Sequence, residues 1–88
     1  MKNIRVHLYD SPNKNREIKT RNFNKVFTVY EKNGKQGIDW NTEHSPYTSR
    51  GDVFVPLDGF SGTTVVFEDV DTGKRYHHDT LTDSIKEV

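Results

Sequence analysis

Four histidines are the side chains of this sequence best suited to chemistry near neutral pH, since imidazole binds metals and exchanges protons there. They are His7, His44, His77 and His78. His77 and Asp79 lie two positions apart, so in a strand they share a face and could give one metal ion a nitrogen and an oxygen ligand. His78 would face the other way, and His44 falls in a polar loop that could fold over either side.

These residues predict a candidate Zn²⁺ site formed from His44, His77, His78 and Asp79. The set lacks the paired spacing of zinc fingers and of H-E-x-x-H helices. The alternative is that the histidines are exposed or paired with nearby side chains.

Catalysis has less support in the residue pattern. A histidine-based ribonuclease needs two imidazoles and a cation, and His7, His44, His77 and Lys74 offer those types. No spacing orders a nucleophile, a base and an orienting group. We therefore expect a protein that is not an enzyme.

The charges are divided between the two halves of the chain, although 13 basic and 13 acidic side chains cancel overall. Residues 1–36 hold nine basic and three acidic side chains, and residues 37–88 hold four basic and ten acidic ones. Such asymmetry often indicates an interaction surface. The alternative is that folding interleaves the halves and cancels the field.

Each half offers one candidate surface. The acidic half would contact a protein partner through Asp58, Glu68, Asp69, Asp71, Asp79 and Asp83. The basic half would bind single-stranded nucleic acid through cations and a stacking ring. Its residues are Arg16, Lys19, Arg21, Lys25 and Tyr30. The pI near 6.9 is low for a nucleic-acid module.

The elements that must position these residues are strands. The chain has no alanine and only three leucines, so good apolar helix formers are nearly missing. Valine and threonine occur nine times each, and ten aromatic residues accompany them. We expect one mainly β domain over residues 1–88, with five to seven short antiparallel strands in a sandwich or barrel.

Two segments carry the clearest strand signals. Residues 3–9 alternate strictly, with Ile4, Val6 and Leu8 on one face. Residues 25–40 read as a hairpin, because Asn33-Gly34 suits a tight turn that needs positive φ at both positions. With this turn, Val29 faces Ile38 and Phe27 faces Trp40, so the four form part of the core.

The C-terminal third predicts a strand over residues 52–57 and a second hairpin over residues 63–79. A three-residue turn, Asp71-Thr72-Gly73, would place His77 opposite Phe67 and His78 opposite Val66. Residues 80–88 fit either a short helix or a last strand.

Three features that are missing from the sequence indicate the cellular compartment. There is no cysteine, no apolar signal-peptide core and no apolar run of membrane-spanning length. We expect a cytoplasmic protein of a bacterial host cell that does not enter a membrane.

In its whole style the chain resembles the small orphan proteins of bacteriophages and mobile elements, including the anti-CRISPR proteins. It is tiny, cysteine-free, rich in predicted strands and without an enzyme motif. The resemblance implies a stoichiometric inhibitor that blocks a CRISPR effector nuclease such as Cas9 by placing acidic side chains in a nucleic-acid groove. The basic first half departs from a full DNA mimic, so only one face would have that role.

Overall fold

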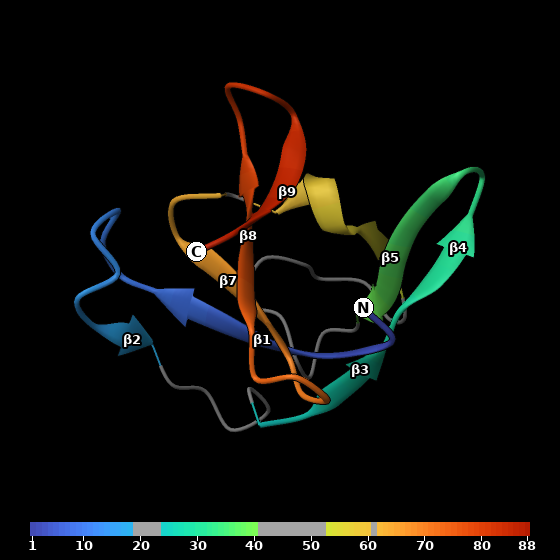
Figure 1. Cartoon of the computed structure of the whole chain (residues 1–88), viewed down its shortest axis with the longest axis horizontal. Coiled ribbons are helices and arrows are strands. Elements are labelled where there is room, and N and C mark those ends of the chain that lie inside the picture. The colour runs from blue at the N-terminus through green and yellow to red at the C-terminus, as the bar shows by residue number, and fades with distance from the viewer. Residues whose placement is uncertain (19–23, 41–52, 61) are drawn as a thin grey trace.

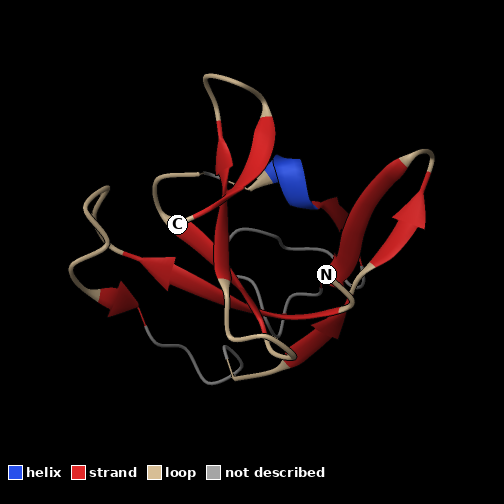
Figure 2. Cartoon of the chain, in the orientation of Figure 1, coloured by secondary structure: helices blue, strands red, loops and turns tan. Residues whose placement is uncertain are grey.

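The larger of two antiparallel sheets is built around the N-terminal strand (Figures 1 and 2). The computed structural model describes residues 1–18, 24–40, 53–60 and 62–88. In this sheet the strands run in the order β2-β1-β7-β8-β9, and β3 also pairs with β1. Their bounds are β1 Asn3–Tyr9, β2 Glu17–Ile18, β3 Val26–Thr28, β7 Val65–Asp69, β8 Arg75–Asp79 and β9 Ser84–Glu87.

The smaller sheet has the order β4-β5-β6 and leads into a single turn of 3₁₀ helix. The bounds are β4 Tyr30–Lys32, β5 Lys35–Trp40, β6 Val53–Pro56 and η1 Leu57–Gly59. The predicted Asn33-Gly34 turn is confirmed, with φ of 53° and 79° at its two residues. The register is the expected one, since Lys32 pairs with Lys35 and Tyr30 with Gly37.

The predicted strand over residues 25–30 is divided at Val29 between the two sheets. The Val29 N–H donates to the Lys2 carbonyl at 2.8 Å, and β3 pairs with β1 rather than with β5. The Phe27 and Trp40 rings nevertheless stack at 4.9 Å, as the hairpin register requires. This division, together with the two-residue β2, gives nine described strands where we expected five to seven.

The core lies between the two sheets and joins both. Alternation in β1 is confirmed, because Ile4, Val6 and Leu8 are almost completely buried against Val65 and Phe67 of β7. From the smaller sheet and η1 come Ile38, Trp40 and Leu57, with Phe27 from β3. Edge-to-face contacts run from Trp40 to Phe60 at 5.7 Å and from Phe60 to Phe67 at 5.2 Å.

The predicted register of the β7–β8 hairpin is wrong by one residue. Phe67 pairs with Tyr76 rather than with His77, because the loop has four residues, 70–73. The Asp69 carbonyl accepts the Gly73 N–H at 2.7 Å, and the Asp69 carboxylate accepts the Asp71 N–H at 3.0 Å. These bonds draw residue 70 into the turn, while Gly73 has positive φ as expected.

A slip of one residue turns every side chain of β8 to the opposite face. His78 therefore lies on the core side, where it is buried, and His77 and Asp79 lie on the outer side. The C-terminal segment, for which helix and strand were both open, forms strand β9 after a turn over residues 80–83.

The tight turn of the smaller sheet gives a first test of the fold. Gly34 has open space around its Cα, so a methyl group there would meet no atom within 4 Å. The cost of Gly34→Ala then comes from positive φ alone, and we expect a loss of about 1 kcal/mol in the free energy of unfolding. Urea denaturation measures it, and an unchanged midpoint would contradict the turn geometry.

Candidate binding surfaces

The outer side of the larger sheet carries a group of ionisable side chains around the buried Val66, which lies opposite His7, and we call this group the polar face. Cross-strand pairing places Arg5 beside Glu68 and Glu68 beside Arg75, so ionisable groups of three strands meet in one row. The members of the polar face are Arg5, His7, Tyr9, Glu17, Glu68, Arg75, His77, Asp79 and Lys86.

His7 lies at the centre of the polar face between two carboxylates. Its Nδ1 is 2.6 Å from Glu17 Oε1, and its Nε2 is 2.8 Å from Glu68 Oε1. An ionised carboxylate only accepts, so the two nitrogens donate at once only when the ring is the charged imidazolium. Both nitrogens are occupied and the side chain is buried, which leaves His7 no free nitrogen to take a proton from a substrate.

Glu68 joins this histidine to a second cation. Arg5 Nη1 lies 3.4 Å from the same Oε1 atom that His7 contacts. The hydrogen bond from His7 is the main cause that holds the pKa of Glu68 below its usual value, and the nearby charges of His7, Arg75 and Arg5 act in the same direction. Arg5 and His7 of the basic first half are thus paired with Glu68 of the acidic second half across β1 and β7.

His77 lies on the same face, but its neighbour is a lysine rather than a carboxylate. Lys14 Nζ is 3.1 Å from His77 Nδ1, and the lysine donates to an unprotonated nitrogen. The pKa of His77 is lowered. Burial is the main cause, and the nearby charge of Lys14 is the second. The geometry therefore favours a neutral imidazole at His77.

The proposed zinc ligands are not brought together. His77 and His78 lie on opposite faces of β8, and His78 Nε2 contacts Asp83 Oδ1 at 2.8 Å. Asp79 accepts the Leu81 N–H and faces Lys86 Nζ at 3.5 Å. In the part of the chain that the structure describes, no three histidine, aspartate or glutamate side chains are grouped to hold a metal ion. His44 lies outside the described residues.

The six acidic residues proposed for partner binding occupy several places. Glu68 and Asp79 belong to the polar face, whereas Asp69 is buried and holds the β7–β8 turn, with Asp71 exposed beside it. Asp58 and Asp83 lie elsewhere, near the β8–β9 turn. Asp58 Oδ2 is 2.8 Å from Lys35 Nζ. The pKa of Lys35 is raised, mainly by its hydrogen bond to Asp58. The charge of Asp83 acts in the same direction but more weakly.

The basic candidates are also divided between the two sheets. Arg16 lies next to β2 and contacts Asp10 Oδ2 at 3.2 Å, and Lys25 Nζ lies 5.4 Å from the centre of the Phe27 ring. Tyr30 belongs to the smaller sheet, where a hydrogen bond to Asp39 raises its pKa to about 12. Lys19 and Arg21 lie outside the described residues.

The turn between β8 and β9 presents a feature that the residue pattern did not indicate. Leu81 is 95% exposed at its tip, the most exposed of the large apolar residues among those described. Side chains order the turn around it. The Asp79 carboxylate accepts the Leu81 N–H at 2.9 Å, and the Thr82 and Ser84 hydroxyls lie 2.8 Å apart. We call residues 80–83 with Lys35 and Asp58 the hairpin end.

Comparison with protein-family models, curated proteins and solved structures finds no match for this chain. None of the helical structure described is long and apolar enough to cross a membrane. The class of protein that the fold defines is a two-sheet, mainly β protein with a hydrogen-bonded polar face and a hairpin end that exposes one leucine.

Proposed function

We propose that this chain acts by binding another protein, as a small inhibitor of a nucleic-acid-handling enzyme of the CRISPR-effector kind. The contact surface in this proposal is the hairpin end, with Leu81 as its apolar anchor. The single observation that carries the proposal is a leucine exposed to 95% on a turn that side-chain hydrogen bonds already hold in place.

The ordered turn supports binding because a surface fixed in advance loses little conformational entropy when a partner covers it. Burial of one leucine side chain in a partner pocket contributes about 1.5–3 kcal/mol. Leu81 is therefore large enough to act as an anchor.

Charge supports a partner with a basic surface. Asp83 in the turn and Asp58 on η1 bring two carboxylates to the hairpin end, against the one ammonium of Lys35. A basic surface that normally contacts nucleic acid would complement this side of the molecule and speed the encounter. Placement there would block the groove of such an enzyme, which is the inhibition that we propose.

The test captures partners of the tagged protein from bacterial lysates, with and without nuclease, and reads them by mass spectrometry. We expect one protein at nearly equal molar amount, resistant to nuclease, and at least about 10-fold less of it with Leu81→Ser, since one leucine anchor is lost. Ile18→Ser is the matched control, because Ile18 is also an exposed apolar residue (38%) but lies on β2 at the opposite edge of the larger sheet.

Equal capture by the wild type and by Leu81→Ser would exclude the hairpin end as the contact surface. If the captured protein disappears after nuclease treatment, the result would instead favour binding of single-stranded nucleic acid by the basic candidate residues.

A further inference from the structure

The outer edge of β9 is a row of backbone groups that faces no described strand. β9 ends the order of the larger sheet in the part of the chain that the structure describes. Its four residues, Ser84 to Glu87, are intermediate or exposed, and no proline or bulge protects them. The unpaired N–H and C=O groups of such an edge can pair with a further strand, and the charged side chains of Lys86 and Glu87 limit which strands fit there.

The pairing with β8 shows which backbone groups point outward. The Val88 N–H donates to the Arg75 carbonyl at 2.9 Å, so these two residues form a hydrogen-bonded pair. Such pairs alternate along an antiparallel ladder, which makes Lys86 with His77 the next one. Ile85 and Glu87 therefore direct their N–H and C=O groups away from β8, toward the outer edge.

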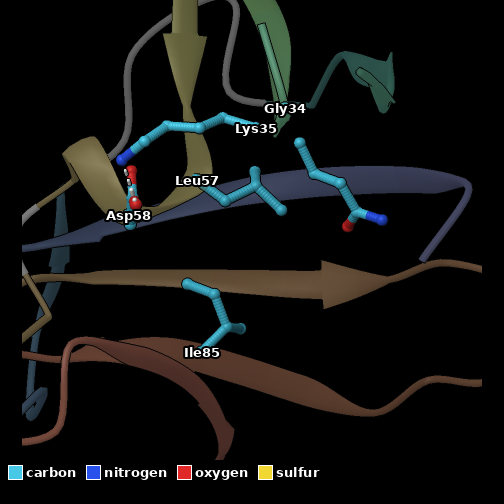
Figure 3. Close-up of a pocket in the computed structure, with 6 residues that line it drawn as sticks. Gly34, Lys35, Leu57, Asp58 and Ile85 are labelled. Carbon is cyan, nitrogen blue, oxygen red and sulfur yellow. Dashed lines mark hydrogen bonds and ion pairs between the residues drawn. The ribbon is translucent and has the colours of Figure 1, made fainter. Parts of the chain in front are cut away.

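A groove lies beside this edge (Figure 3). It has a volume of about 320 Å³, and Figure 3 shows Leu57 and Ile85 facing each other across it, with the Lys35–Asp58 ion pair at one side. Its remaining lining comes from Gly34 and Gln36 in the β4–β5 hairpin. Figure 1 shows that the β8–β9 and β4–β5 hairpins project on either side of η1.

We propose that this edge and groove receive an extended segment of the partner protein, which adds to the larger sheet as a strand beside β9. This inference rests on the proposed function and names the way in which the partner is held. Main-chain hydrogen bonds to Ile85 and Glu87 supply affinity, and an apolar side chain of the segment packs against the partly buried Ile85 at the mouth of the groove.

Charge complementarity identifies the chemistry of the segment. Asp58 stands on the groove wall, Asp83 in the adjoining turn, and Glu87 two positions after Ile85, whereas Lys35 is the one ammonium among the described residues that line the groove. Lys86, also on β9, lies on the opposite face of the strand beside Asp79, so it does not face the groove. A strand with alternating apolar and basic residues matches this arrangement. Its apolar residues would face the groove, and its lysines or arginines would reach the carboxylates.

The probe is a capped hexapeptide of alternating valine and lysine, titrated into the ¹⁵N-labelled full chain. We expect amide shifts that saturate and are confined to β9, η1 and the β4–β5 turn, with slower hydrogen exchange at the Ile85 and Glu87 amides. The same peptide with glutamate in place of lysine should bind at least 10-fold more weakly. Shifts at another strand edge, or none at millimolar peptide, would overturn the proposal.

The Glu87→Pro variant removes one outward N–H, and a proline is tolerated at such an edge position. Glu87→Gln removes the charge but keeps the N–H, so it is the matched control. We expect peptide affinity to fall about 10-fold more with proline than with glutamine, with the amide spectrum of the remaining sheet unchanged. Equal affinity for the two variants would show that the edge N–H is not used.

Capture from lysate distinguishes the proposed protein binding through the hairpin end from the proposed strand addition at β9. If Leu81→Ser loses the partner and Glu87→Pro keeps it, protein binding stands and strand addition fails. If neither change affects capture, strand addition fails and the hairpin end is excluded as the contact surface, and if the wild type captures no protein the proposed function itself fails. Amide shifts in β9 that depend on protein concentration without peptide would indicate a second copy of this chain at the edge, and would also contradict the proposal.

Discussion

Phe67→Ala is expected to lower the free energy of unfolding by about 3–5 kcal/mol, which is a large part of the stability of a domain this small. Phe67 has no solvent-exposed surface, and it lies at the centre of β7 opposite Val6. Its ring contacts Phe60, which in turn contacts Trp40 of the smaller sheet. Loss of this ring would leave a cavity where the two sheets meet.

Urea denaturation followed by Trp40 fluorescence measures this loss. Phe54→Ala is the matched control, since Phe54 is only partly buried and contacts Tyr30 on the smaller sheet. We expect its cost to be less than half that of Phe67→Ala, because less apolar surface returns to water. Equal costs for the two variants would contradict the location of the core.

Glu68→Gln is expected to lower stability at pH 7 by about 1–2 kcal/mol, since His7 and Arg5 both lose their ionised partner. The pKa of Glu68 is lower in the folded chain than its usual value of 4.5. A lowered carboxyl pKa gives stability that is complete well above 4.5 and is lost as the pH falls through the folded value. The difference between wild type and variant should therefore shrink below pH 4.5.

Urea denaturation at pH 7 and at about pH 3 tests this linkage. Glu31→Gln is the control, because Glu31 is exposed on β4 in the smaller sheet. We expect its effect to be within about 0.5 kcal/mol at both pH values. A Glu68→Gln cost that is equally large at pH 3 would show that the loss comes from packing rather than from the ionised bridge.

Local patterns were sufficient to predict the strands that position the surfaces. Strict alternation in residues 3–9 placed Ile4, Val6 and Leu8 in the core, and Asn33-Gly34 set the turn and register of β4 and β5. These features depend on neighbours in sequence and on the two-residue period of a strand. The mainly β class followed from the same signals.

The polar face could not be predicted in the same way, because it is assembled from distant segments. Glu17 is ten residues from His7, and Glu68 is 61 residues away. Alternation alone places His7 outward, but only strand order brings both carboxylates to its ring. The β7–β8 register failed for a more local reason, since the Asp69 carboxylate stabilises a four-residue turn in place of three.

The most direct measurement of the central claim is hydrogen exchange on the complex captured from lysate, compared with the free chain and followed by mass spectrometry. If the hairpin end is the contact surface, exchange should slow in residues 80–88 and remain unchanged in residues 1–18. Slower exchange confined to β1 and β2, with residues 80–88 unaffected, would contradict the claim and assign binding to the polar face.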